Sequence, residues 1–400
     1  MKALRNYLDK IKPNFEEGGK LHAFHSVFDG FESFMFVPST TSKSGTHIHD
    51  AIDSKRIMSI VVIALIPALL FGMYNVGYQH FLAIGQENAG FLNLFGYGFL
   101  AVLPKIIVSY VVGLGIEFIV AQWKNEEIQE GFLVSGILIP MIVPIDCPLW
   151  ILAVATAFSV IFVKEIFGGT GMNVFNVALM TRAFLFFGYP SQMSGDVVWV
   201  AKGSIFGLGE GTLVDSFSGA TPLGQIATTK AEVAIHAING STASLSDMFF
   251  GFIPGSIGET SVVAIAIGAF ILLWTGIGSW KTMVSVFVGG IVMGLIFNQF
   301  GAADNFMAQM PWYQHLMLGG FCFGAVFMAT DPVTSARTET GKYIFGFLVG
   351  AMAIIIRVLN PGYPEGMMLA ILLMNIFAPL IDYYVVQSNT TRRIKRAINK

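Results

Sequence analysis

The sequence has little charge and almost no cysteine, and each scarcity excludes classes of protein. Only 12% of its 400 residues are charged and 54% are hydrophobic, whereas soluble domains have about 25% charged and about 45–50% apolar residues. The composition is therefore that of a polytopic membrane protein. Cys147 and Cys322 lie far apart in apolar surroundings, which excludes a disulfide framework or a cysteine-rich zinc or iron–sulfur site within this chain. A redox cofactor here must be organic or shared with a partner.

Two further signals are missing. No apolar segment follows the first methionine, so we expect no cleavable signal peptide and a cytoplasmic N-terminal arm over residues 1–56. No Gly-x-Gly-x-x-Gly fingerprint follows a strand pattern, so the chain has no signal for binding a dinucleotide by itself. The net charge of −2 says little about partners, and we expect no nucleic acid among them.

What the sequence does contain is a series of apolar runs. Crossing a hydrocarbon core takes about 20 residues, and ten runs are candidates, two of them short or interrupted. They lie at about 57–77, 97–122, 131–145, 149–167, 174–189, 260–277, 281–299, 314–330, 343–359 and 365–386. The pattern predicts an all-α polytopic membrane protein with about ten transmembrane helices.

The basic residues are distributed unevenly among the predicted loops. Of the 23 Lys and Arg residues, 17 fall on segments that would face the cytoplasm. Two fall outside and four lie within spans, namely Lys202 and Lys230, and Lys105, Lys164, Arg182 and Arg357. Cytoplasmic loops carry such an excess, so we expect both termini in the cytoplasm.

One long interval divides the ten spans into two sets of five. An odd number of spans per set forces the sets into opposite orientations, which is typical of an inverted repeat. We expect a first five-helix repeat at 57–189, an extracytoplasmic loop at 190–259, a second repeat at 260–387 and a basic cytoplasmic tail at 388–400.

Each predicted repeat has two interruptions at corresponding places. In the first they are Pro144 to Pro148 and Gly168 to Asn173, and in the second they are Thr330 to Pro332 and Asn360 to Met368. Irregular backbone at membrane depth survives only inside protein or beside a cavity, because lipid cannot satisfy its amides. We therefore predict a central site and a gate where the breaks meet.

Three acidic residues lie within or beside the predicted spans: Glu117 in the second, Asp331 at a break and Asp382 near the end of the tenth. Carboxylates in a membrane are by default functional or paired, and cations such as Na⁺ prefer oxygen ligands. We interpret the three as a cation pathway. The alternative is purely structural: Lys164 with Glu165, Arg182 or Arg357 with a nearby acid, and Asp382 in contact with solvent.

Two other patterns leave alternatives open. Gly113 and Gly115 either let helices approach closely or form a notch for a flat aromatic head group such as a quinone. The His47 to Asp50 cluster could be a metal site. Its simpler interpretation is a helix N-terminus, with Asp50 or Asp53 capping the first membrane helix, and we predict no metal.

The interval between the halves holds the most distinctive motif. It reads Asp215-Ser216-Phe217-Ser218-Gly219-Ala220-Thr221-Pro222-Leu223. Gly219 and Pro222 predict a turn that presents Thr221 outward. Small neighbours leave room for an enzyme to reach its weakly nucleophilic hydroxyl. An ordinary loop turn is the alternative, and we interpret Thr221 as a site of covalent modification.

This run resembles the flavinylation motif of a membrane-protein family. The family comprises the NqrB component of the Na⁺-translocating NADH:quinone oxidoreductase and its relative, the RnfD component of the Rnf complex. The resemblance covers essentially the whole chain, and the long N-terminal arm is more similar to that of NqrB. Further similar stretches are Glu130 to Val134, Lys164 to Gly171, Arg182 to Phe187, Ile253 to Glu259, Met328 to Pro332 and Asn360 to Met368.

The resemblance implies a urea-transporter-like inverted repeat and a set of cofactors. It implies FMN joined to Thr221 by a phosphoester bond, with Asp215, Ser218, Gly219 and Ala220 as the flavinylation motif. It also implies a noncovalent riboflavin, ubiquinone or menaquinone as the electron acceptor, and Na⁺ as the transported ion.

Further positions are carried over from the same resemblance. Gly113 falls on the first of a glycine pair associated with the quinone site, but the second position here is Leu114. Glu117, Asp331 and Asp382 fall on acidic positions proposed for Na⁺ movement.

The implied setting is a six-subunit complex in the bacterial inner membrane. It includes an NADH-oxidising subunit with FAD and a 2Fe–2S cluster and a second FMN-bearing subunit, and a flavin transferase matures it. The implied function is electron transfer from FMN through riboflavin to quinone, coupled to Na⁺ export, by a subunit inactive alone. Two alternatives stay open: a component of an Rnf-type ferredoxin:NAD⁺ complex, and a cofactor-free urea- or solute-channel-like protein, since a fold can be shared without its chemistry.

Overall fold

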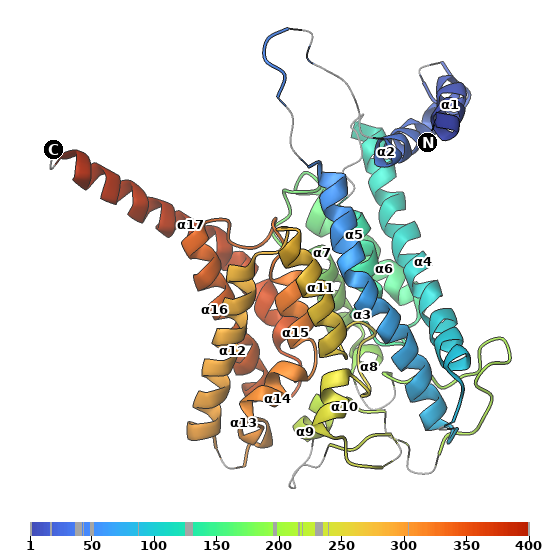
Figure 1. Ribbon diagram of the computed structural model, residues 1–400, viewed down its shortest axis with the longest axis vertical. Coiled ribbons are helices and arrows are strands. Elements are labelled where there is room, and N and C mark those ends of the chain that lie inside the picture. Colours follow the sequence, from blue (N-terminus) through green and yellow to red (C-terminus); the bar gives the residue numbers. More distant parts are fainter. Residues whose placement is uncertain are drawn as a thin grey trace.

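The computed structural model describes residues 2–16, 18–36, 42, 44–48, 52–86, 88–124, 131–194, 198–214, 217, 219–228, 235–238, 240–302 and 304–398. Within these ranges the fold is helical, with two isolated β-bridges and no strand (Figure 1). Five helices are long and apolar enough to cross a bilayer. The predicted class, an all-α polytopic membrane protein, is confirmed.

The first half follows the predicted spans in order. It contains α3 (Ser54–Ala83), α4 (Phe91–Lys124), α5 (Phe132–Met141), α6 (Leu149–Ser159) with its π-helical continuation η3 (Val160–Glu165), and α7 (Val177–Gly188). Asp53 caps α3, because its Oδ1 accepts a hydrogen bond from the Arg56 amide at 2.9 Å. The predicted cap of the first membrane helix is thus confirmed.

The second half is also helical and contains one π-helical segment. It contains α11 (Val262–Trp274), α12 (Trp280–Phe300), α14 (Trp312–Met317), α15 (Phe321–Phe323) with the π-helical η4 (Gly324–Met328), α16 (Glu339–Leu359) and α17 (Met367–Ile398). α3 packs against α11, and α7 packs against α17. The first helices of the two halves are therefore in contact, and so are the last, as expected for two repeats related by a twofold axis.

Several helices differ in length from the predicted spans. α3, α4 and α17 have 30, 34 and 32 residues, so they are about 45–50 Å long and extend beyond a hydrocarbon core of about 30 Å. α5, α7 and α11 have only 10, 12 and 13 residues, too few to cross alone. The predicted span at 314–330 is divided among α14, α15 and η4.

Irregular backbone continues the short helices, and protein surrounds it. After α5 the chain is fully buried at Ile142, which confirms the break predicted at Pro144 to Pro148. The Arg182 guanidinium donates to Ile142 O at 2.6 Å, and the Lys105 ammonium donates to Cys147 O at 2.8 Å. These side chains satisfy carbonyl groups that lipid would leave unpaired.

The N-terminal arm contains a helical hairpin, which was not predicted from the sequence. It contains α1 (Lys2–Ile11), η1 (Lys12–Asn14), η2 (His22–Phe24) and α2 (His25–Met35). Glu32 of α2 is buried and pairs with Arg5 and Lys12, each at 3.0 Å. Ser26 Oγ donates to Gln122 Oε1 at 3.0 Å, and this bond fastens the hairpin to the end of α4.

Part of the histidine cluster of the arm can be placed. The His47 Nδ1 accepts a hydrogen bond from the Ser42 amide at 3.2 Å, while His49 and Asp50 lie outside the described residues. Among the residues that the structure describes, no group of three His, Cys, Asp or Glu side chains could hold a metal ion.

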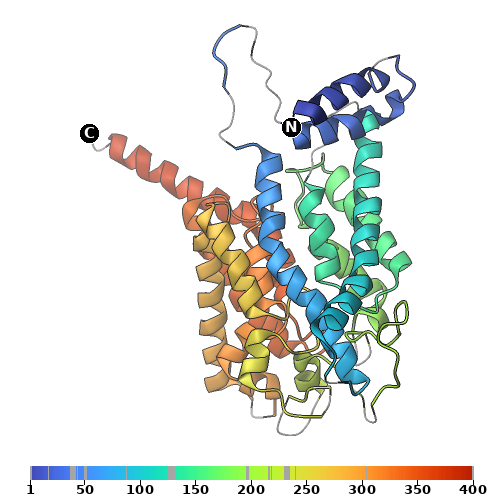
Figure 2. The ribbon, with the colours of Figure 1, turned by 45° about the vertical axis from the view of Figure 1, so that its right-hand side comes forward.

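The bundle has two different ends. The N-terminal hairpin and the last turns of α17 lie at one, here called the terminal end (Figures 1 and 2). The opposite end, here called the loop end, carries α9 (Pro222–Thr228), α10 (Leu245–Phe250) and α13 (Phe306–Gln309). In the chain, the short α8 (Pro190–Met193) precedes α9. His80 of α3 binds the segment between α8 and α9. Its Nδ1 lies 2.6 Å from Ala201 O and its Nε2 lies 3.0 Å from Gly209 O.

Candidate functional site

Thr221 immediately precedes α9 at the loop end. Its Oγ1 accepts a hydrogen bond from the Gly224 amide at 3.1 Å, so the threonine caps the helix. Gln225, one turn into the helix, donates from its side chain to Ala220 O at 3.1 Å and to His236 O at 2.9 Å. The turn is therefore fixed on both sides of Thr221.

The other described residues of the motif differ from Thr221 in burial. Asp215 and Ser218 lie outside the described residues. Gly219 and Ala220 are buried and Thr221 is half-buried. The predicted outward presentation is thus met only in part, because the small residues pack inward and leave the threonine partly open.

A buried charge network lies behind the turn. Thr221 lines a small cavity of about 20 Å³ together with Glu259 and Glu365. Arg182 of α7 pairs with both acids, with Nη1 3.0 Å from Glu259 Oε1 and Nη2 against Glu365 Oε2. Removing one partner of a buried pair leaves an uncompensated charge and costs about 3–5 kcal/mol. The pairs therefore join α7 to the segment before α11, through Glu259, and to the segment between α16 and α17, through Glu365.

Arg357 of α16 extends this network through backbone. It is fully buried and donates to the carbonyl groups of His315 at 2.6 Å, Leu318 at 3.2 Å and Glu365 at 3.0 Å. The structural alternative predicted that Arg182 or Arg357 pairs with a nearby acid. Arg182 does so, whereas the hydrogen bonds of Arg357 go to carbonyl groups.

A second cavity, of about 100 Å³, lies toward the terminal end and has mainly apolar walls that include a few polar residues. The first turns of α3, at Ile57 and Met58, and Lys164 of η3 line it. Two predicted breaks meet there, since Thr170 and Asn173 come from the first half and Thr330 to Val333 from the second. The predicted meeting of all four breaks at one central site is therefore found only in part, because Pro144 to Pro148 and Asn360 to Met368 do not line this cavity and Glu365 lines the cavity behind Thr221.

Asp331 is the acidic residue of this cavity. Its carboxylate accepts hydrogen bonds from Asn176 Nδ2 at 3.0 Å, Thr334 Oγ1 at 2.9 Å and the Val333 amide at 3.0 Å. The three donors hold both oxygens of the Asp331 carboxylate in place, and carboxylate oxygen is a ligand that hard cations prefer.

The other two predicted cation residues are elsewhere. Glu117 of α4 is buried and forms an ion pair with Lys164, whose side chain reaches the cavity. Lys164 does not pair with Glu165, as one interpretation had it, because Glu165 lies 3.6 Å from Lys124. Asp382 of α17 binds the start of α16 instead. The three carboxylates do not form one site.

Asp382 is occupied by backbone donors. It accepts from the Arg337 amide at 2.7 Å, the Thr338 amide at 3.0 Å and Thr338 Oγ1 at 2.6 Å. Thr338 in turn caps α16. Asp382 therefore joins α17 to the N-terminus of α16, where a negative charge is favourable.

The glycine notch on α4 is filled by an aromatic ring. A Cβ at Gly113 would lie 2.0 Å from the Phe132 ring, whereas a Cβ at Gly115 would meet nothing within 4 Å. Leu114 packs at the edge of the core. Close packing accounts for Gly113 in this structure, and a quinone site at Gly113 and Leu114 stays a prediction.

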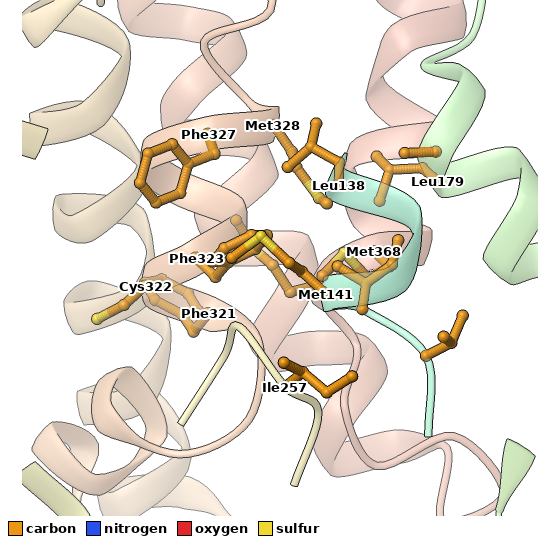
Figure 3. Close-up of a cluster of buried hydrophobic side chains, with 14 of the residues drawn as sticks. Leu138, Met141, Leu179, Ile257, Phe321, Cys322, Phe323, Phe327, Met328 and Met368 are labelled. Atoms are coloured by element: carbon orange, nitrogen blue, oxygen red, sulfur yellow. The ribbon is translucent and has the colours of Figure 1, made fainter. Parts of the chain in front are cut away.

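A layer of buried apolar side chains lies in the core of the bundle (Figure 3). Leu138 and Phe327 line the terminal-end cavity. Met141 and Phe323 pack at the next level and surround Gly258, where a Cβ would lie 2.7 Å and 3.1 Å from them. Gly258 directly precedes Glu259 of the charge network. Met141 and Phe323 are fully buried, so a cation that moved between the cavities would have to pass between apolar side chains.

Comparisons with known proteins agree with this architecture. Residues 41–391 match the model of the NQR2, RnfD, RnfE family. The chain is 44% identical over 416 residues to the B subunit of the Na⁺-translocating NADH-quinone reductase of Chromohalobacter salexigens, covering 98% of this chain and 96% of that protein. It is 43% identical over 421 residues to the protein of the same name from Klebsiella pneumoniae strain 342, with 98% and 99% covered.

A third relative, the protein of the same name from Pseudomonas aeruginosa strain LESB58, is 42% identical over 415 residues, with 98% and 99% of the two chains covered. The helical bundle, with five described helices long and apolar enough to cross a bilayer, defines a polytopic membrane protein. The chain belongs to the NQR2, RnfD, RnfE family.

Proposed function

We propose that this chain is the membrane flavoprotein subunit of a sodium-pumping NADH:quinone oxidoreductase. The observation that carries the proposal is the Thr221 motif at the loop end, in a chain similar over 98% of its length to proteins named as the B subunit of that enzyme. The relatives also match the N-terminal arm, which precedes the family match at residue 41. This favours the NqrB component over the Rnf-type alternative and over a cofactor-free channel.

FMN esterified to Thr221 fits the surroundings of that residue. A Cβ at Gly224 would lie only 3.2 Å from Thr221 Oγ1, so the glycine keeps the hydroxyl clear. The cavity behind Thr221 is too small for a flavin ring. A larger groove of about 390 Å³ begins at Ile226, on the same helix, and has apolar walls with Gln309 and Gln314. We assign the ring to this groove, where the amides would hold its polar edge.

When bound, the flavin supplies one- and two-electron chemistry, and the residues of this chain supply position. Thr221 tethers the flavin, Gln225 fixes the tether, and the Arg182 network holds the turn against the bundle. Riboflavin and the quinone would follow in the electron path toward the other end. Gly113 and Leu114 are the proposed quinone contacts.

Na⁺ would enter the terminal-end cavity at Asp331, with Glu117 and Asp382 as further members of the pathway. Export requires the apolar layer around Met141 and Phe323 to open. The ion can shift that equilibrium only by its difference in affinity for the two states. We place the terminal end in the cytoplasm of a bacterial inner membrane, as the distribution of Lys and Arg favours, with the other subunits of the complex around it.

Thr221→Ala tests the attachment. The wild-type chain, expressed with its flavin transferase, should keep flavin fluorescence in a denaturing gel, and Thr221→Ala should lose it. Thr228→Ala is the matched control, because Thr228 lies on the same helix and only binds the carbonyl groups of its own turn. Covalent flavin on Thr221→Ala would overturn the site.

A further inference from the structure

A groove of about 390 Å³ runs between α16 and α17 at the terminal end, away from the two cavities. It faces outward, since most of its residues are exposed. It is lined by Thr340, Ile344, Ile381, Tyr384, Val385, Ser388, Asn389 and Arg392.

The polarity of the groove changes along its length. On α17 its residues recur every three or four positions and therefore share one helix face. They run from Ile381 and Val385 through Ser388 to Arg392, from apolar to charged. On α16 the order is the same, because Thr340 lies in the first turn and Ile344 one turn deeper. Both walls thus become polar toward the terminal end.

Aromatic residues mark the depth at which this change occurs. Trp280, Tyr343, Tyr383 and Tyr384 are exposed at the start of α12, the start of α16 and on α17. Lys281 lies 5.9 Å from the ring centres of Trp280 and Tyr343. Exposed Trp and Tyr gather at the boundary between hydrocarbon and head groups, so the groove spans that boundary.

Beyond the boundary, the charge on α17 is positive. From Tyr383 to Ile398 α17 contains no acidic residue and four basic ones, namely Arg392, Arg393, Lys395 and Arg396. Asp382, just before this stretch, is held by the backbone of residues 337 and 338. Basic pockets between transmembrane helices at the cytoplasmic side bind anionic lipid head groups.

From this arrangement we infer a binding site for an anionic phospholipid. Arg392 binds the phosphodiester, with Ser388 and Asn389 as hydrogen-bond donors. One acyl chain lies along Ile344, Ile381 and Val385. The apolar half would serve no purpose for a soluble anion, and the polar half matches a head group. The inference rests on the proposed cytoplasmic position of the terminal end, and it is independent of the flavin and of ion transport.

Native mass spectrometry of the full chain, purified with the subunits that accompany it, tests the site. Micelles are doped with phosphatidylglycerol or phosphatidylcholine, and retained lipid is counted. Arg392→Gln should weaken phosphatidylglycerol binding about fivefold, the factor expected for one basic residue at a lipid surface. Arg393→Gln is the matched control: it removes the same charge one position along, outside the groove, and should bind like the wild type.

A second variant tests the apolar half without changing charge. Ile344→Trp should fill the groove and also release the lipid. Equal losses in Arg392→Gln and Arg393→Gln would reduce the effect to general surface charge and overturn the site. So would full retention by Ile344→Trp, equally tight phosphatidylcholine, displacement by inorganic phosphate, or lipid held by the chain alone but absent from the complex.

Discussion

The side-chain amide of Asn176 donates to the carboxylate of Asp331 at 3.0 Å, across 155 positions of sequence. The Oδ1 of the same Asn176 accepts from the Leu179 amide at 3.2 Å, so one residue both caps α7 and holds the acid of the terminal-end cavity. α7 also carries Arg182. The cavity and the charge network behind Thr221 are therefore connected through a single helix.

Asn176→Asp should make stability depend on Na⁺. Asp is as good an N-cap as Asn, but here it puts a second carboxylate beside Asp331. We expect a lower melting temperature than wild type in choline chloride and a recovery in NaCl, because a bound cation offsets the repulsion. A thermal-shift assay in the two salts measures this. Asn176→Ala, which loses the cap and about 1 kcal/mol, adds no second carboxylate and should therefore recover less in NaCl than Asn176→Asp does. The absence of any Na⁺ response in Asn176→Asp would argue against a cation at Asp331.

Gly113→Ala and Gly115→Ala separate packing from quinone binding. A Cβ at Gly113 collides with the Phe132 ring, whereas Gly115 faces open space. Overpacking costs about 1–3 kcal/mol, so Gly113→Ala should lower the melting temperature and Gly115→Ala should not. Measuring the KM for quinone alongside decides the role of the notch. An unchanged melting temperature with a raised KM would favour the quinone site over packing.

Glu117→Gln should destabilise the chain, because it leaves the Lys164 ammonium buried beside an uncharged group. The expected loss is about 3–5 kcal/mol. The double variant Glu117→Gln with Lys164→Met removes both charges and should recover much of that stability. Chemical denaturation of the three proteins in detergent provides the comparison. Na⁺ transport is then measured on the double variant. Full transport would show that Glu117 is not part of the cation pathway.

Asp382→Asn should loosen the start of α16. Three donors from Arg337 and Thr338 lose a charged acceptor, and hydrogen bonds to charged groups contribute about 1.5–3 kcal/mol each. Hydrogen exchange of residues 337–341 should accelerate. Asp304→Asn, a change at an exposed acid near the loop end, is the control. Lost Na⁺ transport with unchanged exchange would instead give Asp382 a direct role in the pathway.

The sequence predicted the parts of this structure that depend on local chemistry. Long apolar runs predicted the helices, and Asp53 predicted the start of α3. Pro144 and Pro148 predicted the break after α5. It could not supply partners brought together by folding. Glu117 meets Lys164 across 47 positions and Arg182 meets Glu365 across 183. The sequence favoured the adjacent Glu165 as the partner of Lys164. In the structure the Glu165 carboxylate pairs with Lys124 instead.

The apolar layer also has an electrical consequence. If water fills the cavities on either side, most of the membrane potential falls across the few residues between them, such as Met141, Phe323 and Met328. Moving one elementary charge through the full potential requires about 2.3 kcal/mol per 100 mV. That work would then be concentrated in one short step, so the voltage dependence of transport would report on the opening of this layer rather than on binding at either cavity.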